Sequence, residues 1–384
     1  MVMRKSEKGN LARAGIRDIK PYVPGRPLDE VKREYGLRDV IKLASNENAL
    51  GPSPLAVTAI KKAANQIHLY PDAEAYALGK ALSVSLGIGP DHLVFGNGGE
   101  EIVTLIGKAL INEGERCVLP RPVYDAYETV VRVMGGEICP SDLSEYRINL
   151  DDMFDKIDDR TKLVFICNPM NPTGTIVTKD ELDRFVRRVP SRTVIVLDEA
   201  YCHFVSHASY PDGIDYVRDG RNVIVLRTFS KVYGLGGLRI GYGVAKPELI
   251  HWLRQVKEPF NVNALAQIGA LAALQDDDHV RKTIDLVRTE KAFLYGEFSN
   301  LGLEYVPSET NFIFVNLGTD ATAVFHQMLE KGIIIRPGHI WGLPQFVRLT
   351  IGTRNENERL IRALRRLPVF SAQTINSRKR GGDV

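Results

Sequence analysis

LVFIC (163–167), KDELDRFVRR (179–188) and TVIVLD (193–198) follow one another in the chain as an apolar run, a helical pattern and a second apolar run. The two apolar runs are rich in Val, Ile and Leu, which is typical of strands that are buried on both faces of a sheet. A helix between two such strands provides the crossover that parallel strands require. This stretch therefore predicts an α/β fold with a parallel sheet between layers of helices.

The same alternation of apolar runs and helical patterns continues on both sides of this stretch. Further strands are expected at LVF (93–95), CVL (117–119), NVIVLRT (222–228) and IGYGVA (240–245). Helices are expected at 53–66, 76–86, 246–257, 263–275 and 277–299. The pattern predicts a large α/β domain built on a mostly parallel sheet.

The pattern changes after the last of these helices. Shorter strands (NFIFVN, GIIIRP and FVRLTIG) and helices at 320–331 and 355–366 predict a small α+β unit. We therefore expect four segments: an N-terminal arm that packs on the small domain or on a partner subunit (1–48), a large domain that holds the ligand site (49–290), a small C-terminal domain (291–370) and a basic tail (371–384).

The composition of the chain indicates which binding partners and which cellular compartment to expect. The 384 residues include 50 Lys and Arg against 47 Asp and Glu, a net charge of +3, which does not favour nucleic acid or an anionic membrane as a partner. No apolar run approaches the roughly 20 residues that a membrane span needs. The start, MVMRKSEKGNLARAG, lacks the apolar core of a secretion signal, and the four cysteines show no CxxC spacing, so we expect reduced thiols in a cytoplasmic protein.

A Gly-rich turn, GNGGEE (96–101), joins one expected strand to a helix. The free N–H groups at the start of a helix suit a phosphate, although a plain tight turn is an equally good interpretation. The turn is not a dinucleotide fingerprint, because Glu101 stands where GxGxxG requires Gly, and no GxxxxGK[ST] motif occurs.

Two polar side chains follow neighbouring strands. Asn171 stands in NPTG (171–174), where a simple loop is the alternative interpretation, and Asp198 follows five apolar residues. A carboxylate so placed is partly desolvated and needs a cationic partner. Glu199 should point to the opposite face and have a structural role. His203 and His207 lie four residues apart without an HExxH arrangement, so we expect no metal site.

Cationic residues follow the next expected strand and recur in the small domain. Lys231 stands beside two hydroxyl residues, Thr228 and Ser230, with Arg239 eight residues further on. An exposed lysine is the ordinary interpretation, but a desolvated lysine near another cation becomes a nucleophilic amine. The small domain carries two arginines of the kind that bind carboxylate or phosphate, Arg336 and Arg348.

One ligand satisfies all of these features. Pyridoxal 5′-phosphate (PLP) has a phosphate, an aldehyde for an amine, a ring nitrogen that attracts an anion and a ring oxygen that accepts hydrogen bonds. The ordered set of Gly-rich turn, NPTG, DEAY (198–201), Lys231 and two arginines therefore predicts a PLP site.

At this point the sequence resembles the fold-type I, aspartate-aminotransferase-like PLP enzymes over about residues 18–368. NPTG, DEAY and SKVYGLGGLR (230–239) carry the resemblance. Within that superfamily, the chain is most similar to the histidinol-phosphate aminotransferases, on stretches such as LASNENALGPSP, LYPD, GNGGEE and RPVYDAYE. The resemblance implies a large domain with a mostly parallel sheet of seven strands flanked by helices, and a small α+β C-terminal domain. It also implies ping-pong transamination of histidinol phosphate with 2-oxoglutarate, in histidine biosynthesis.

The resemblance also implies roles for residues around the cofactor. Lys231 would bind the cofactor aldehyde through its amine and act as general base and acid, and Asp198 would pair with the ring nitrogen. Tyr201 and Asn171 would bond the ring hydroxyl, and Tyr124 would stack on the ring. The phosphate would be surrounded by Gly98, Gly99, Glu100, Thr228, Ser230 and Arg239.

Further roles concern the substrate and a second subunit. Tyr70 would reach the phosphate from the other subunit, which implies a homodimer with shared sites. Arg348 would bind the substrate carboxylate. Tyr22, Asn46 and Arg336 would contact the substrate, with Tyr22 and Arg336 near its phosphate.

Alternatives on the same fold remain. HIWGLP (339–344) adds an aromatic residue at the substrate end, and related aromatic aminotransferases have similar runs. An aromatic or broad-range aminotransferase is therefore the main rival, and a threonine-phosphate decarboxylase is a weaker one. A non-catalytic PLP-binding regulator is disfavoured, because no DNA-binding extension is left over. The basic tail has no assigned role.

Overall fold

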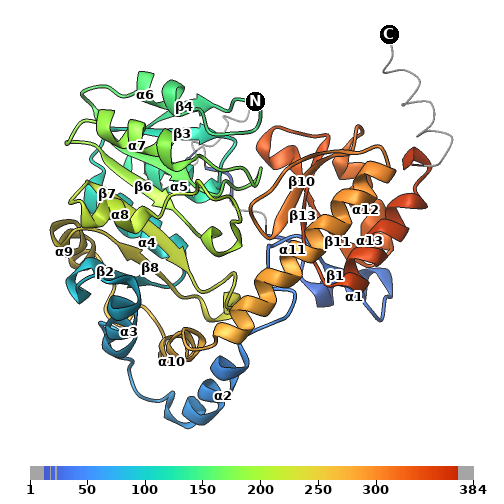
Figure 1. Ribbon diagram of the computed structural model, residues 1–384, viewed down its shortest axis with the longest axis horizontal. Coiled ribbons are helices and arrows are strands. Elements are labelled where there is room, and N and C mark those ends of the chain that lie inside the picture. Colours follow the sequence, from blue (N-terminus) through green and yellow to red (C-terminus); the bar gives the residue numbers. More distant parts are fainter. Residues whose placement is uncertain (1–12, 18, 22–23, 371–384) are drawn as a thin grey trace, which may run out of the picture.

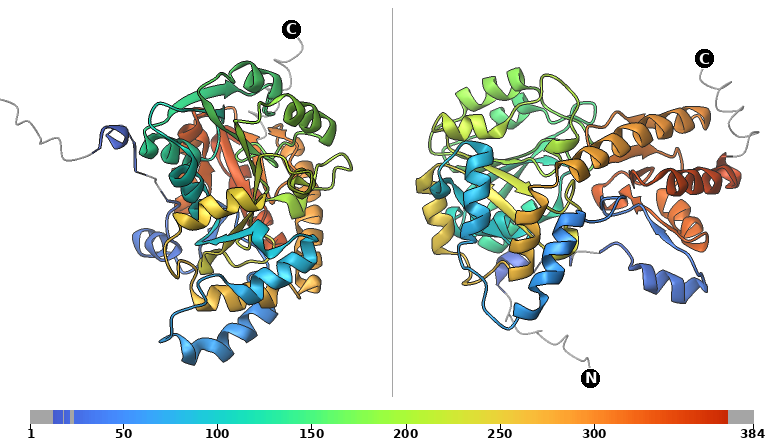
Figure 2. Two further views of the ribbon diagram at one scale, coloured as in Figure 1. Left: turned by 90° about the vertical axis from the view of Figure 1, so that its left-hand side faces the viewer. Right: turned by 60° about the horizontal axis from the view of Figure 1, so that its bottom comes forward.

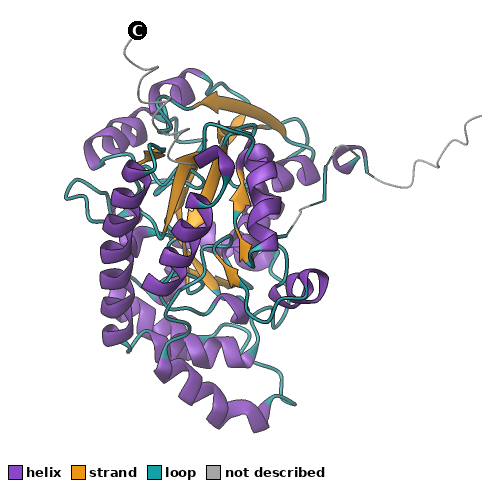
Figure 3. Cartoon of the chain, turned by 90° about the vertical axis from the view of Figure 1, so that its right-hand side faces the viewer, coloured by secondary structure: helices purple, strands orange, loops and turns teal. Residues whose placement is uncertain are grey.

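The computed structural model describes residues 13–17, 19–21 and 24–370. These residues form a larger lobe around one sheet and a smaller lobe around another, joined by a long helix, α11 (Asp277–Asn300) (Figure 1). The right-hand view of Figure 2 also shows the lobes side by side, with α11, in orange, running between them. The strands lie inside and the helices outside (Figure 3).

The larger lobe contains a seven-stranded, mostly parallel sheet, as predicted. In spatial order, its strands are β2 (Leu93–Gly96), β8 (Gly241–Val244), β7 (Val223–Thr228), β6 (Val194–Asp198), β5 (Thr161–Cys167), β3 (Arg116–Arg121) and β4 (Glu137–Asp142). Only β8 runs antiparallel to its neighbours. The carboxyl ends of the other strands therefore meet at one edge, where open α/β sheets bind ligands.

Both faces of the central part of this sheet are buried, because strands such as β5, β6 and β7 carry mainly apolar residues. Along β5, Val164 and Ile166 pack in one core cluster, and Phe165 and Cys167 pack in another on the opposite face. The helices of this lobe are α2 (Pro54–Ala63), α3 (Tyr76–Leu86), α4 (Gly99–Leu110), α5 (Asp125–Met134), α6 (Leu150–Asp155), α7 (Lys179–Arg188), α8 (Gly213–Arg218), α9 (Pro247–Gln255) and α10 (Ala264–Ala273). The clusters place α4, α5 and α9 on one face and α3, α6, α7, α8 and α10 on the other.

The smaller lobe contains two small sheets. One is antiparallel, in the order β12 (Arg336–Pro337), β13 (Phe346–Thr350), β10 (Phe312–Asn316) and β9 (Glu304–Val306). The other pairs β1 (Ile41–Lys42) in parallel with β11 (Ile333–Ile334), so the N-terminal arm joins this lobe. Helices α1 (Leu28–Tyr35), α12 (Ala321–Glu330) and α13 (Arg354–Arg365) complete it. The predicted boundary near residue 290 falls within α11, and the four-segment division remains a prediction.

The structure differs from the expected elements in several places. Besides β4, the strands β1 and β9 and the helices α1, α6 and α8 were not expected. The edge strand β4 was not predicted, because EICPSD holds only scattered apolar residues and is buried on alternate positions. The single strand expected at GIIIRP is divided into β11 and β12, which pair in different sheets. None of the helices in the described part of the chain combines the length and the apolar character that a membrane crossing needs.

Candidate active site

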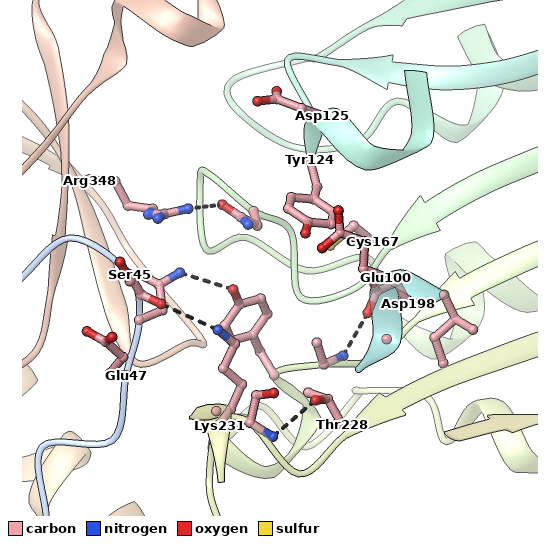
Figure 4. Close-up of a pocket in the computed structure, with 18 of the residues that line it drawn as sticks. Ser45, Glu47, Glu100, Tyr124, Asp125, Cys167, Asp198, Thr228, Lys231 and Arg348 are labelled. Carbon is pink, nitrogen blue, oxygen red and sulfur yellow. Dashed lines mark hydrogen bonds between the residues drawn. The ribbon is translucent and has the colours of Figure 1, made fainter. Parts of the chain in front are cut away.

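A cavity of about 320 Å³ lies where the carboxyl ends of the parallel strands face the smaller lobe. Its size falls within the usual range for small-molecule sites, roughly 300–1,000 Å³. Thirteen of the predicted site residues line it: Asn46, Gly99, Glu100, Tyr124, Asn171, Asp198, Tyr201, Thr228, Ser230, Lys231, Arg239, Arg336 and Arg348. Figure 4 shows that Lys231, Asp198 and Arg348 approach the same space from different elements.

Asp198 ends β6 and brings a carboxylate to the cavity wall. Its Oδ2 accepts a hydrogen bond from the Tyr127 hydroxyl (2.5 Å), and its Oδ1 accepts one from the Ala200 N–H (3.0 Å). Burial raises the pKa of Asp198, while the hydrogen bond from Tyr127 lowers it. Among the described residues, no Lys, Arg or His forms an ion pair with this carboxylate. A cationic group bound in the cavity would therefore be stabilised by Asp198.

Lys231 follows β7 and points its amine into the same cavity. Its Nζ donates to the Ser45 carbonyl at 3.5 Å and lies 5.5 Å from the centroid of the Tyr201 ring. Burial, together with the positive charge of Arg348, lowers the pKa of Lys231 to about 8, although Asp198 acts in the opposite direction. With this pKa, roughly a tenth of the amine is uncharged at pH 7, far more than for an ordinary lysine, and this fraction can act as a nucleophile or general base.

An anion-binding cradle lies between the Gly-rich turn and the segment after β7. Gly99 begins α4, whose first N–H groups have no partners within the helix. Gly98 has φ 83°, and a Cβ there would stand 2.4 Å from Nη2 of Arg239, so glycine allows this guanidinium to approach the turn. Thr228 Oγ1 accepts a hydrogen bond from the Ser230 N–H at 3.0 Å. These groups can together bind a phosphate.

Arg348 lies on β13 and reaches the cavity from the smaller lobe. Its Nη1 donates to Asn171 Oδ1 at 2.5 Å, and its Nη2 donates to the Ala44 carbonyl at 2.9 Å. Its Cζ lies 5.3 Å from the centroid of Phe312 and 5.1 Å from that of Trp341. The guanidinium thus lies near two aromatic rings, and an arginine so placed can bind a carboxylate with its planar pair of donors.

Asn46 and Tyr201 form a second contact between the arm and the larger lobe. Asn46 Nδ2 donates to the Tyr201 hydroxyl at 3.0 Å, and the Asn46 N–H donates to Thr350 Oγ1 at 2.9 Å. The Tyr201 ring packs edge-on against Phe312 with centroids 5.2 Å apart. Burial raises the pKa of Tyr201 to about 12, so its hydroxyl keeps its proton near neutral pH.

Glu199 points away from the cavity, on the opposite face of the sheet from Asp198. It is buried and accepts hydrogen bonds from the guanidinium of Arg227 (2.7 Å to Nη2) and from the Gly213 N–H (2.8 Å). His203 lies against the ring of Tyr233, and within the described residues no three His, Cys, Asp or Glu side chains converge to hold a metal ion. The structural role expected for Glu199 matches these contacts.

Two of the predicted residues, Gly98 and Tyr70, lie outside the cavity wall. Gly98 lies close to the guanidinium of Arg239, which does line the cavity. Tyr70 precedes α3, is 84% exposed and stacks on Phe260 with centroids 4.9 Å apart, so it does not reach the cavity of its own chain. Tyr22 lies outside the described residues.

Sequence reasoning missed three residues of the site. Tyr127 donates a hydrogen bond to Asp198. The sequence offered one signal for it: Tyr127 lies three residues after Tyr124, which directly precedes α5, and residues three apart lie on the same face of a helix. Asp125 and Glu47 also line the cavity. No motif marked Asp125, whose pKa is raised by burial and lowered by the charge of Arg336.

The residues present fit PLP. Lys231 provides an amine of lowered pKa, and Asp198 provides a partly buried carboxylate that lacks a cationic partner within the described residues. The cradle at Gly99 and Arg239 suits a phosphate, and Tyr124 provides an aromatic wall.

Comparisons with known proteins agree with this geometry. Residues 38–364 match the family model for aminotransferase class I and II. The chain is 52% identical to the histidinol-phosphate aminotransferase of Moorella thermoacetica, over 92% of each chain. It is 45% identical to the enzyme of the same name from Caldicellulosiruptor saccharolyticus, over 91% of this chain and 98% of that one.

Solved structures show the same fold. The histidinol-phosphate aminotransferase of Sinorhizobium meliloti, solved in complex with pyridoxal-5′-phosphate, matches with a TM-score of 0.86 and 26% identity, over 97% of this chain and 99% of that one. An aspartate aminotransferase from Thermotoga maritima matches with a TM-score of 0.79 at 22% identity, over 87% and 93%. The predicted fold class is confirmed, and the chain belongs to the class I and II aminotransferase family.

Proposed function

We propose that this protein is a PLP-dependent aminotransferase that converts histidinol phosphate and 2-oxoglutarate to imidazole acetol phosphate and glutamate. The proposed reaction class rests on one observation: Lys231, Asp198 and Arg348 line the same cavity. The relatives named histidinol-phosphate aminotransferase, at 52% and 45% identity, support the choice of substrate.

Five kinds of contact would hold the cofactor. The cradle of Gly98, Gly99, Glu100, Thr228, Ser230 and Arg239 would bind its phosphate, with Tyr70 from a second subunit. Asp198 would stabilise a positive charge on its ring nitrogen, and Tyr201 and Asn171 would bond its ring hydroxyl. Tyr124 would stack on the ring, and the Lys231 amine would bind the aldehyde. When bound, PLP supplies an aldehyde that captures amino groups and a ring that takes up an electron pair.

Lys231 would also move the proton that transamination requires. Near neutral pH its amine is partly uncharged, so Nζ can accept a proton from the substrate carbon that bears the amino group and then return it as a general acid. Asp198, held by Tyr127 and Ala200, opposes the loss of positive charge from the ring nitrogen.

The smaller lobe would bind the parts of the substrate that do not react. Arg348 would bind a carboxylate of glutamate or 2-oxoglutarate, replacing its present contact with Asn171. Arg336, together with Tyr22 and Asn46, would contact histidinol phosphate, with Arg336 and Tyr22 near its phosphate.

A steady-state comparison tests this function. The purified protein, supplied with PLP and 2-oxoglutarate, should have a kcat/KM for histidinol phosphate that is at least about 100-fold higher than for phenylalanine, since several charged contacts to the phosphate are at stake. A higher value for phenylalanine would support the rival aromatic aminotransferase, which Trp341 in the cavity wall favours. Release of carbon dioxide from a phosphorylated amino acid would instead indicate a decarboxylase.

We further propose a homodimer with shared active sites. Apolar side chains around the segment between α2 and α3 are exposed: Leu55, Ile67, Leu69, Tyr70, Tyr76 and Phe260. Exposed apolar patches of this kind are typical of protein interfaces. If Tyr70 completes the partner's site, then a mixture of Lys231→Ala and Tyr70→Ala proteins should regain activity that neither has alone. A monomer in sedimentation analysis, or no recovery in the mixture, would contradict shared sites.

A cytoplasmic location is proposed as well. Cys117, Cys139, Cys167 and Cys202 are all free thiols, and the first three are buried. Reduced thiols are usual in reducing compartments.

A further inference from the structure

Tyr127 makes the shortest hydrogen bond to the carboxylate that faces the cavity, yet it does not line the cavity itself. We infer that Tyr127 is a positioning residue, which fixes the orientation and the negative charge of Asp198 from behind the cavity wall. The inference rests on the proposed function, because it assigns the purpose of this contact to the cofactor that Asp198 would hold.

The Tyr127 ring is fixed by its neighbours. It is fully buried on α5, stacks on Phe165 of β5 with centroids 4.9 Å apart and planes 21° apart, and meets the edge of Tyr124 at 5.7 Å. Phe165 pairs with Val196 on the adjacent strand β6, two residues before Asp198. The hydroxyl is therefore aimed at the carboxylate by packing that does not depend on a ligand.

The two oxygens of Asp198 each accept one hydrogen bond, from donors on different elements. Tyr127 donates to Oδ2 at 2.5 Å, and the Ala200 N–H donates to Oδ1 at 3.0 Å. Two donors fix the plane of a carboxylate more strictly than one. Burial by itself favours the neutral acid, and a hydrogen bond to the charged form opposes this, so Tyr127 helps Asp198 to remain an anion.

A purely structural role does not account for the hydroxyl. Phenylalanine would retain the stacking on Phe165, and a buried hydroxyl is unfavourable unless it finds a partner. The partner that Tyr127 finds is the carboxylate of the site, which distinguishes it from an ordinary core aromatic residue.

The first test compares Tyr127→Phe with the unsubstituted protein. PLP is titrated into each apo-protein, and the dissociation constant should rise about tenfold, near the lower end of the contribution of a hydrogen bond to a charged group. In turnover, kcat should fall by a similar factor, while the KM for histidinol phosphate changes less than about twofold. An unchanged dissociation constant and an unchanged kcat would overturn the inference.

Tyr216→Phe is the matched control. The Tyr216 hydroxyl also donates to a carboxylate, Asp183 Oδ1 at 2.6 Å, but this pair lies away from the cavity. The control should leave the PLP dissociation constant unchanged, and an equal effect in both variants would show a general loss of stability and overturn the inference. Urea unfolding of both variants gives the change in the free energy of unfolding that the loss of each hydroxyl causes.

A double-mutant cycle tests whether Tyr127 acts through Asp198. In an Asp198→Asn background, adding Tyr127→Phe should change the PLP dissociation constant by less than about twofold, because the charge that the hydroxyl supports is gone. A full tenfold loss in that background would contradict the inference. If the unsubstituted protein fails to bind PLP, the proposed function and this inference fall together, whereas loss of the Tyr127 effect alone leaves the function intact.

Discussion

Arg348 of the smaller lobe donates a hydrogen bond to Asn171 of the larger lobe, with 2.5 Å between Nη1 and Oδ1. Both residues line the cavity, and the contact joins the NPTG loop after β5 to the strand β13. The Arg348 guanidinium is therefore already held inside the cavity, next to Asn171, before a substrate enters. Because the side chain is already ordered, less conformational entropy is lost when a substrate binds.

Replacing Arg348 should weaken the binding of both dicarboxylic substrates. Arg348→Ala is expected to raise the KM for glutamate and for 2-oxoglutarate by roughly 30-fold or more, since a charge-assisted pair is lost. Arg348→Lys should recover little, because lysine does not offer the same planar pair of donors. Steady-state kinetics with each substrate measures this. An unchanged KM in Arg348→Ala would remove the residue from the carboxylate site.

Removing the carboxylate of Asp198 should slow the chemical step. Asp198→Ala is expected to reduce kcat by about 10²–10³-fold, the range for loss of one preorganised electrostatic group. Rapid mixing of the PLP-loaded variant with glutamate isolates that step from product release. Undiminished turnover at saturating PLP would contradict the role proposed for Asp198.

The lowered pKa of Lys231 predicts a pH dependence. An ordinary lysine has a pKa of 10.5, and in this site the pKa is lowered to about 8 by burial and by Arg348, so the reactive neutral amine predominates above that pH and declines below it. The rate at which PLP combines with the apo-protein should therefore rise through a midpoint at about pH 8 and then level off. A midpoint near 10.5 would show a solvated lysine.

The buried pair of Glu199 and Arg227 should contribute to stability rather than to catalysis. Glu199→Gln leaves Arg227 with the partly exposed Asp212 as its remaining acidic partner, and we expect a loss of about 3 kcal/mol in the free energy of unfolding. Glu358→Gln is the control, because its pair with Arg362 is exposed and should contribute less than about 1 kcal/mol. Urea unfolding measures both. Equal effects in the two variants would contradict the account of Glu199.

The sequence predicted the elements that depend on local pattern. Strands such as β5 and β6 contain continuous apolar runs, and α7 follows the helical pattern of KDELDRFVRR. By contrast, β4 depends on pairing with β3, which no local pattern encodes.

The same distinction holds within the site. Residues at strand ends, such as Asp198 and Lys231, were predicted because a parallel sheet brings those ends together. The contact of Tyr127 with Asp198 joins residues 71 positions apart, and it depends on how α5 packs on the sheet. The contact of Arg348 with Asn171 depends on how the two lobes are placed, which no motif specifies.

The most direct measurement identifies the lysine that binds PLP. The PLP-loaded protein is reduced with borohydride, digested and mapped by mass spectrometry. Lys291 is a built-in comparison, because burial also lowers its pKa to about 8, but its Nζ donates to the Ser308 carbonyl and it does not line the cavity. The account predicts a single pyridoxyl label on Lys231. A label on Lys291 or on any other lysine, with Lys231 unmodified, would contradict it.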